Sequence, residues 1–255
     1  MKKILFLVVF VITYSTNISQ TMVLKRANGA IDYVQLNNTV EITFSTQNSC
    51  QIITTVLYGG KTYNTVQIGT QCWLKENLNI GTRITGSSNQ TDNNTIEKYC
   101  YDNLETNCDT YGGLYQWAEA VQYSNGATNT TSPSPAFSGN VQGICPSGWH
   151  IPTHDEYQTL STTVNNIGNK LLAIGQGTGL GAGTNTSGFS GLLAGYCYSY
   201  NGSFYNIRSY AYFLISTETS ATMAYYLILF GNSSDFYIYN DSKNNNGFSV
   251  RCLKD

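Results

Sequence analysis

The sequence predicts an α+β protein in which two helices precede a run of short antiparallel strands. Two segments in the middle of the chain show helical spacing of apolar residues, and the part after Phe189 consists of β-prone runs separated by Gly, Asn and Ser turns. Because helices and strands do not alternate as βαβ units, the sheet is expected to be antiparallel. Seven cysteines in 255 residues add the expectation of disulfide stabilisation.

Composition limits the classes of function. Charged residues make up 11% of the chain and the formal net charge is −2, whereas soluble domains typically carry ~25% charged residues. The sequence has no basic stripe to displace counterions from a phosphate backbone, so a nucleic-acid partner is not expected. The hydrophobic content of 41% is enough for a substantial core.

The N-terminal segment has the layout of a secretory signal peptide. Lys2 and Lys3 precede an uncharged apolar run, Ile4 to Ile12, and small polar residues follow. This run is too short to span a bilayer, and no other segment of the sequence is long and apolar enough to do so. We therefore expect residues 1–19 to be removed as a signal peptide. The mature chain is then secreted or lies at the cell surface without a membrane span.

Turn residues divide the remaining chain into a short extension and a larger domain. Residues 20–57 contain strand-like runs such as "DYVQL" and are expected to form a β-rich extension. Gly59 and Gly60 lie between two β-prone runs, which predicts a hairpin, since both central residues of a type I′ turn have positive φ. The larger domain is expected over residues 58–255, with loops at 81–95, 124–143 and 175–187.

Apolar spacing predicts two helices in the first half of this domain. The first lies in "GGLYQWAEAVQY" and the second begins within "ICPSGWHIPTHDEYQTL". Thr153 and Glu156 form a capping box at the start of the second helix, and Pro152 prevents this helix from extending backwards. The apolar faces comprise Leu114, Trp117, Ala118 and Val121 in the first helix and Tyr157, Leu160 and Val164 in the second.

The segment around the second helix start also holds both histidines, which raises the question of a metal or catalytic site. His150 and His154 are four residues apart, but Pro152 lies between them, so their side chains are not expected on one helical face. Asp155 and Glu156 are the further ligands nearby, and Glu156 is needed for the cap. A semi-buried His150 and an exposed His154 are the expected outcome. Without a "GxSxG" elbow or a recognisable reactive cysteine, the protein is predicted not to be an enzyme.

Several motifs in order carry a resemblance to a known family. The segments "TVQIGTQCWLKENLN", "YCYDNLETNCDTYGGLYQWAEAV", "GICPSGWHIPTHDEYQTL", "SYAYFLISTET" and "GFSVRCLKD" are similar to the Fibrobacter succinogenes major paralogous domain, from about Tyr58 to Asp255. More distantly, the helix region and the terminal "GFSVRC" resemble the C-type lectin-like fold shared with sulfatase-modifying factors. The resemblance implies a secreted or surface domain without an established activity. It also implies a lectin-like domain with two helices and a curled antiparallel sheet.

The seven cysteines are assigned partly from this resemblance. It implies a disulfide between Cys145 and Cys252, which ties the second helix region to the last strand, and it also covers Cys100 and Cys108, which bracket a short polar loop. Six cysteines alone allow 15 connectivities. The remaining cysteines are expected to form an extra bridge, Cys72–Cys197, with Cys50 left over.

The second half of the domain is rich in Tyr, Asn, Ser and Gly, with few charges. Tyrosine supplies rigid amphipathic contact area, and Ser, Gly and Asn supply adaptable hydrogen bonds, as in antibody paratopes. Alternation along a strand places Tyr237 and Tyr239 on one face. Leu214 and Tyr225 stand where the family commonly has tryptophan. The candidate ligand-binding residues are Tyr205, Tyr226, Asn232, Tyr237, Tyr239, Asn240 and Asp241.

Calcium-dependent sugar binding is not indicated by the sequence. The chain lacks the lectin motifs "EPN", "QPD" and "WND". The oxygen-rich residues Asp235, Asn240 and Asp241 suit calcium as ligands, but their spacing matches no calcium-binding motif, so no cofactor or metal is predicted.

The sequence therefore predicts a non-catalytic recognition module, secreted or at a bacterial surface, that binds a glycan or a surface protein. Two alternatives remain at this point. One is a structural surface or adhesin component without a discrete ligand pocket, and the other is an enzyme acting on cell-wall polysaccharide.

Overall fold

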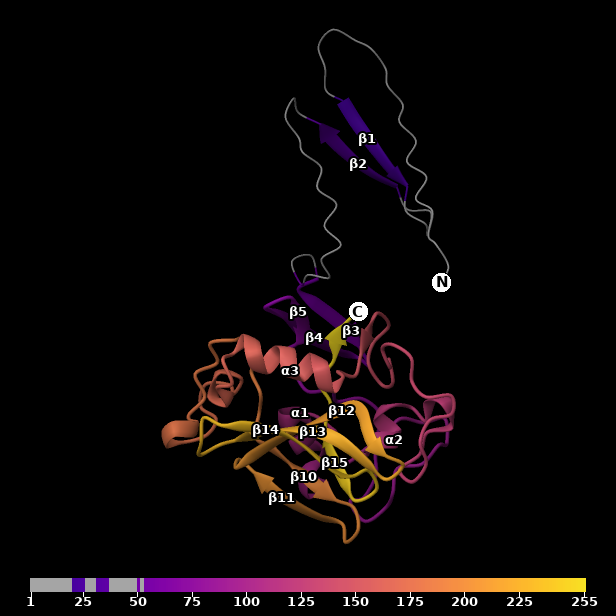
Figure 1. The fold of residues 1–255 in the computed structure, drawn as a ribbon, viewed down its shortest axis with the longest axis vertical. Helices are drawn as coiled ribbons and strands as arrows, with labels where there is room; N and C mark the ends of the chain where they lie inside the picture. Colours follow the sequence, from indigo (N-terminus) through magenta and orange to yellow (C-terminus); the bar gives the residue numbers. More distant parts are fainter. Residues whose placement is uncertain (1–19, 26–30, 37–49, 51–52) are drawn as a thin grey trace. The chain divides into compact units, whose positions relative to one another are not determined.

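The computed structural model describes residues 20–25, 31–36, 50 and 53–255, and the chain falls into two units, Met1–Thr46 and Gln47–Asp255 (Figure 1). In the first unit, β1 (Gln20–Lys25) pairs antiparallel with β2 (Ile31–Leu36). The expected signal peptide lies outside the described residues. The second unit begins earlier than the boundary expected after residue 57, because the strand at Thr55–Tyr58 is part of its sheet.

A seven-stranded, curled sheet dominates the second unit. Its order is β11-β10-β15-β12-β13-β14, with β8 paired to β15. Neighbouring strands are antiparallel except for single parallel bridges that join β12 to β10 and to β15. The strands are β8 (Leu114–Tyr115), β10 (Ala194–Tyr198), β11 (Ser203–Ile207), β12 (Tyr210–Ser220), β13 (Met223–Phe230), β14 (Phe236–Ser242) and β15 (Asn246–Ser249).

A smaller, five-stranded sheet joins the beginning of this unit to its end. Its order is β3-β4-β5-β16-β9. Gly59 and Gly60 have φ of 55° and 76° in the β3–β4 turn, which confirms the predicted hairpin. The strands are β3 (Thr55–Tyr58), β4 (Lys61–Ile68), β5 (Gln71–Leu74), β9 (Trp149–His150) and β16 (Leu253–Lys254), and a separate parallel pair is formed by β6 (Thr82–Arg83) and β7 (Glu97–Lys98).

Three α-helices and four 3₁₀ turns complete the unit. The second predicted helix is confirmed as α3 (His154–Thr163), with Thr153 as N-cap and the predicted capping box to Glu156. The remaining helices are α1 (Glu105–Tyr111) and α2 (Trp117–Ala120), and the 3₁₀ turns are η1 (Tyr101–Asn103), η2 (Ser124–Gly126), η3 (Gly168–Lys170) and η4 (Gly179–Gly181).

The first predicted helix is mostly wrong. Leu114 and Tyr115 pair with β15 as strand β8, and only Trp117–Ala120 is helical. Gln116 between them is extended, and its backbone N–H donates to the side-chain oxygen of Gln90. The apolar spacing is therefore real, but pairing with the sheet satisfies the backbone groups that a longer helix would have used. Helix α1, in contrast, lies in what the sequence suggested was a polar loop.

Two apolar clusters cover the two faces of the large sheet. One contains Phe213 and Leu227 of the sheet, Tyr157 of α3 and Trp73 of β5, so α3 packs between the small and the large sheet, as Figure 1 also shows. The other cluster joins the opposite face of the sheet to Trp117 of α2. Burial of both faces in the middle of the sheet makes this one continuous folded unit.

Three disulfides are present, and one differs from expectation. Cys100 is bonded to Cys108 and Cys145 to Cys252, the two pairs expected. The predicted Cys72–Cys197 bridge is wrong, because Cys72 is bonded to Cys50 and Cys197 is a buried free thiol. The side chain of Gln67 opposite Cys72 accepts a hydrogen bond from the Cys50 backbone N–H, which holds Cys50 beside β5. Cys197 lies in the other sheet, opposite Phe204 and Gly247.

The disulfides also bear on the compartment. Such bonds persist in oxidising surroundings, so three of them in one unit indicate an extracytoplasmic protein. Within the described part of the chain, none of the helices combines the length and the apolar character that crossing a bilayer requires.

Candidate binding face

Strand alternation gathers aromatic side chains on one face of the large sheet. Successive side chains of a strand point to opposite faces of the sheet. In β12, β13 and β14, Phe213, Leu227 and Ile238 point towards α3, and the residues next to each of them in the strand point to the other side. On that other side the register places Tyr226 directly opposite Tyr239. We call this surface the tyrosine face, and it comprises Tyr196, Tyr205, Tyr210, Tyr212, Tyr226, Phe230, Tyr237, Tyr239 and Phe248.

The rings of the tyrosine face form an unbroken series of contacts across five strands. Tyr205 of β11 lies 5.6 Å from Tyr196 of β10, measured between ring centroids, and Tyr196 lies 5.1 Å from Tyr212 of β12. From there the contacts pass through Tyr226 to Tyr239, and Tyr237 closes the series. Phe230 and Tyr210 connect Tyr237 back to Tyr212. Contacts at these separations stabilise ring pairs beyond the area they bury.

The face has a buried base and an exposed margin. Tyr212 and Phe248 are stacked at 5.1 Å and are only 8% and 5% exposed. Tyr205, Tyr237 and Tyr239 are 40%, 45% and 48% exposed. Exposed rings supported by buried rings are held in place before any ligand arrives, so little conformational entropy remains to be lost on binding.

A carboxylate, that of Asp241, lies on the same side of the sheet as the tyrosine face. Asp241 pairs with Ala224 in the β13–β14 register, two residues beyond the Tyr226–Tyr239 pair, and so lies on the same side as these rings. Burial, followed by the nearby Asp241 carboxylate, raises the pKa of Tyr226 to about 12. The Tyr226 hydroxyl is therefore a neutral donor and acceptor at physiological pH.

The structure brings together five of the seven predicted ligand-binding residues and separates two. Tyr205, Tyr226, Tyr237, Tyr239 and Asp241 share the tyrosine face, as described above. Asn240 pairs with Tyr225 on the opposite side of the sheet, and Asn232 lies beyond the end of β13, in the wall of a pocket next to the tyrosine face. Because Asn240 and Asp241 project to opposite faces, they do not form the joint oxygen ligand set considered from the sequence.

Several members of the face were missed from the sequence. Tyr196, Tyr210 and Tyr212 alternate along β10 and β12 with the same two-residue period as Tyr237 and Tyr239. That period could have been used to place the tyrosines of each strand on one face. The order of strands in the sheet, which makes the separate stripes one surface, cannot be read from spacing alone.

The structure separates the two histidines. His150 is buried, with Nδ1 2.7 Å from Asp255 Oδ1 and Nε2 2.9 Å from Glu156 Oε1. Burial acts to lower the pKa of His150, but the hydrogen bonds and charges of Glu156 and Asp255 outweigh it and raise the pKa. His154 is apart from this group, with its ring 4.5 Å from that of Tyr225. We call this arrangement at the start of α3, in which Glu156 and Asp255 hold the two ring nitrogens of His150, the clamp.

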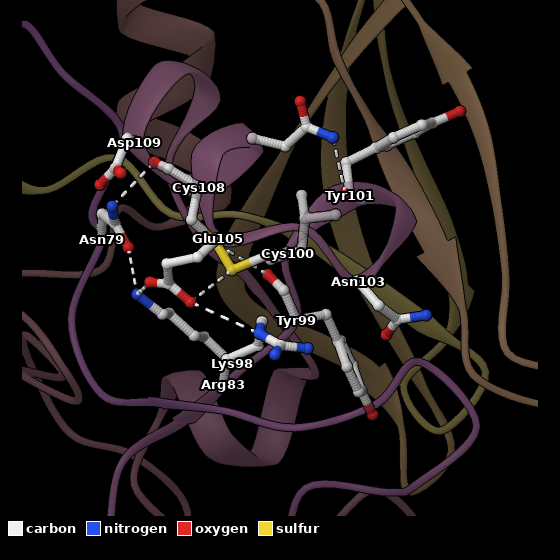
Figure 2. Close-up of a disulfide and its surroundings, with 12 residues drawn as sticks. Asn79, Arg83, Lys98, Tyr99, Cys100, Tyr101, Asn103, Glu105, Cys108 and Asp109 are labelled. Carbon is white, nitrogen blue, oxygen red and sulfur yellow. Dashed lines mark hydrogen bonds and ion pairs between the residues drawn. A yellow bond between two sulfur atoms is a disulfide. The ribbon is translucent and has the colours of Figure 1, made fainter.

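A second polar group surrounds the Cys100–Cys108 disulfide. The two sulfur atoms and the Glu105 carboxylate lie within 4.8 Å of one another, but the sulfurs are bonded to each other and offer no thiolate (Figure 2). Glu105 instead binds Lys98 at 2.7 Å and approaches Arg83 at 3.5 Å, as Figure 2 shows. The arrangement is an ion-paired disulfide loop.

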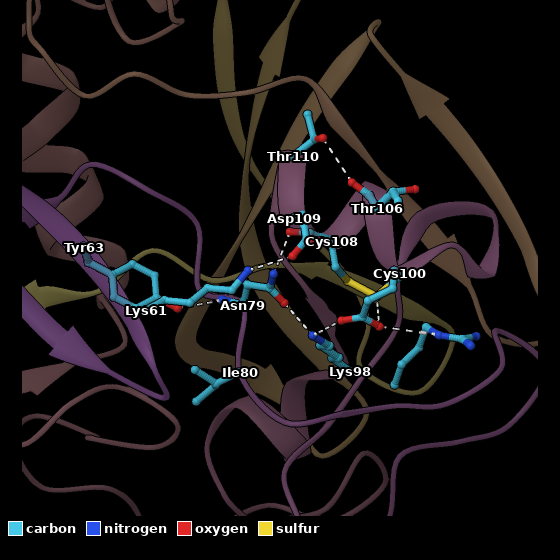
Figure 3. A network of polar contacts seen from close by, with 12 residues as sticks. Lys61, Tyr63, Asn79, Ile80, Lys98, Cys100, Thr106, Cys108, Asp109 and Thr110 are labelled. Carbon is cyan, nitrogen blue, oxygen red and sulfur yellow. Dashed lines mark hydrogen bonds and ion pairs between the residues drawn. A yellow bond between two sulfur atoms is a disulfide. The ribbon is translucent and has the colours of Figure 1, made fainter.

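The same group extends into the core through Asn79. Its side-chain oxygen accepts from Lys98 Nζ at 2.6 Å, and its amide donates to the Cys108 carbonyl at 2.7 Å (Figure 3). Tyr63 accepts the backbone N–H of Asn79, and at the edge of the network Lys61 binds Asp109 at 3.0 Å. Each buried polar group in this network has a partner, so the network fixes α1 against β4.

Comparison with known proteins places this architecture in a family. The model of the Fibrobacter succinogenes major domain matches residues 66–254, which run from within β4 to the end of β16. The chain belongs to the Fibrobacter succinogenes major domain family. The whole tyrosine face lies within the residues that match the Fibrobacter major domain. No curated protein and no solved structure was found to match the chain.

Proposed function

We propose that this protein is a non-catalytic recognition module that binds a glycan, or alternatively a surface protein, through the tyrosine face. The observation that supports this most strongly is the set of exposed rings Tyr205, Tyr237 and Tyr239 around a buried aromatic base. A surface of rings and hydroxyls suits sugars, which offer C–H groups for stacking and hydroxyls for hydrogen bonds.

The proposal includes a place outside the cell. The three disulfides support export, and the apolar run that follows Lys2 and Lys3 supports export through a signal peptide. A recognition module in that location would act in adhesion to surfaces or to extracellular polymers.

A C-type lectin-like fold is part of the same proposal. It is supported by two main helices, a curled antiparallel sheet, and the Cys145–Cys252 bond that ties the α3 region to the terminal strand. Such folds are scaffolds that host many different sites, so the scaffold itself does not identify the ligand.

We propose that the protein is not an enzyme, because hydrogen bonds and ion pairs within the described polar clusters hold their side chains in structural roles. His150 is held on both ring nitrogens by carboxylates, and Glu105 is held by two cations. An enzyme acting on cell-wall sugars would instead lose turnover when His150 or Asp155 is replaced.

A glycan array with the purified protein, run with and without calcium, tests the proposal. The wild type should give saturable, selective binding, and the double variant Tyr237→Ala/Tyr239→Ala should lose it while its midpoint of thermal unfolding changes little. Leu57→Ala is a matched control, because Leu57 is an exposed apolar residue of β3 outside the tyrosine face. Equal binding by the double variant would contradict the proposal. Concentration-dependent assembly without selective binding would instead favour a structural surface component.

A further inference from the structure

A pocket of 570 Å³ lies beside the tyrosine face. Its walls come from the Gly175–Thr178 loop, from the turn between β11 and β12, and from the end of β13. The side chains that matter here are Gln176, Thr178, Asn206, Arg208, Tyr210 and Asn232. The volume falls within the ~300–1,000 Å³ range of small-ligand sites.

Close backbone packing fixes the walls of the pocket. Gly177 lies so near the carbonyls of Gly181 and Gly231 that a Cβ would approach them to 2.3 and 2.6 Å. Thr178 N–H donates to the Gly231 carbonyl, and Gly231 N–H donates to the Ser209 carbonyl. The loop, the end of β13 and the β11–β12 turn are therefore joined directly, and the pocket exists without a ligand.

Hydrogen-bond donors and a positive charge characterise the lining. Arg208 is the single charged residue among the lining residues, and among the described contacts its guanidinium has neither an ion pair nor a hydrogen bond. Its φ of 62° is unusual for a residue with a side chain, and such positions are retained where the surrounding structure requires them. The side-chain oxygen of Gln176 accepts the Leu193 N–H, which leaves its amide nitrogen to donate.

The pocket and the tyrosine face are physically continuous. Tyr210 lines the pocket and also contacts Tyr212 and Phe230 of the tyrosine face. Asn206 of the pocket donates to the Tyr212 hydroxyl at 2.8 Å. A ligand longer than one sugar can therefore lie on the rings and reach Arg208.

We propose that this pocket binds the anionic group of an acidic glycan whose neighbouring sugars lie on the tyrosine face. This inference rests on the proposed function and gives its ligand class. The planar fork of an arginine matches a carboxylate or a sulfate ester with two parallel hydrogen bonds. The amides of Gln176 and Asn232 supply further donors to the same group.

The test measures binding of the full-length protein to polygalacturonate, which carries carboxylates, to dextran sulfate, and to neutral dextran. Arg208→Gln should weaken binding to the acidic glycan by about tenfold or more, since it removes a charge-assisted pair. Lys254→Gln is the matched control, because it removes the same charge from β16 in the other sheet. The acidic glycan whose binding depends on Arg208 identifies carboxylate or sulfate as the ligand group.

The outcomes separate this inference from the proposed function. If Arg208→Gln and Lys254→Gln weaken binding of the acidic glycan equally, binding depends on the overall charge of the protein. That result would overturn the proposal that the pocket binds the anionic group. Binding that depends on Tyr237 and Tyr239 but not on Arg208 would overturn the pocket and leave the tyrosine face standing. Failure of the wild type to bind any of these glycans or those of the array would overturn both the pocket and glycan binding by the tyrosine face, and would leave a surface protein as the ligand to test. Circular dichroism and thermal unfolding establish that each variant is folded.

Discussion

The guanidinium of Arg251 lies 2.7 Å from the side-chain oxygen of Asn77 in the interior, where no carboxylate of the described residues pairs with it. Two backbone carbonyls, of Leu74 and Phe189, accept its other hydrogen bonds, and the Phe189 ring lies 4.3 Å from the guanidinium carbon. Burial lowers the pKa of Arg251 to about 10, so the residue remains charged at neutral pH. The charge is accommodated by dipoles and an aromatic face.

Asn77→Ala should therefore destabilise the protein strongly. It removes an acceptor from a buried cation, and hydrogen bonds to charged groups contribute ~1.5–3 kcal/mol each. Chemical denaturation gives the change in the free energy of unfolding. Asn93→Ala, at an exposed turn, is the control and should change that energy by less than ~0.5 kcal/mol. Similar effects of the two substitutions would show that Asn77 does not hold the Arg251 charge.

The disulfide assignment predicts a specific pattern of thiol reactivity. Burial raises the pKa of the Cys197 thiol to about 12, so Cys197 should react with an alkylating reagent only after unfolding. Cys50→Ser should destabilise by ~3 kcal/mol, because it opens a loop of 22 residues, while Cys197→Ala should cost less. Peptide mapping under non-reducing conditions checks the pairs, and a peptide that joins Cys72 to Cys197 would contradict the structure.

The clamp around His150 predicts a loss of stability as pH rises above the ordinary histidine pKa of ~6.5. The pKa of His150 is raised in the folded state, so its contribution is complete below the unfolded value of ~6.5 and is lost as pH rises through the folded value. Burial acts to raise the pKa of Glu156, but His150 and Thr153 overcome it and lower this pKa, so its contribution is lost in acid. In Glu156→Gln, which keeps the cap but weakens the clamp, the free energy of unfolding should fall less than in the wild type as pH rises above ~6.5. An unchanged alkaline slope would argue against this assignment.

A second pH effect comes from Glu119, a buried carboxyl in the α2 turn. Burial raises its pKa to about 7, although the Glu97 N–H and the Tyr123 hydroxyl donate to it. The folded state thus binds this proton more tightly than the unfolded state, and stability declines as pH rises from the unfolded value through 7. Glu119→Gln keeps an oxygen that accepts the Glu97 N–H, and its amide N–H can donate to the Tyr123 hydroxyl oxygen, which reverses the wild-type hydrogen bond. It should remove a pH-dependent loss on the order of 2 kcal/mol, measured between pH 5 and 8. A variant that keeps the wild-type pH dependence would refute the role of Glu119.

Local signals made much of this fold predictable. The Thr153–Glu156 capping box and the Gly59–Gly60 turn each act within a few residues, and both are present as expected. The failures arose where distant segments compete for the same groups. Leu114 and Tyr115 pair with β15, which lies far along the chain. Cys50 reaches Cys72 because the Gln67 side chain of β4, opposite Cys72, holds the backbone of Cys50. Such choices depend on which strands become neighbours.

The candidate site divides in the same way. The alternation of Tyr237 and Tyr239 is a property of a single strand, and it identified one margin of the tyrosine face. Asn240 was included for its chemistry, although the same alternation sends it to the other side. Arg208 lies in a turn whose positive φ has no sequence signature outside Gly, Asn and Asp, so the pocket beside it could not be anticipated.

The position of β16 has a consequence for how this protein acquires its structure. β16 lies between β5 and β9, so the small sheet is interrupted until Leu253 and Lys254 have been synthesised. The disulfide of Cys145 likewise cannot form before Cys252, which lies 107 residues further along the chain, is present. Contacts of such long range slow folding, because the entropy of closing a long loop must be overcome before these contacts form. A chain without Leu253 and Lys254 would therefore have β5 and β9 without the strand that joins them, so a few residues of β16 hold together segments that are far apart in the sequence.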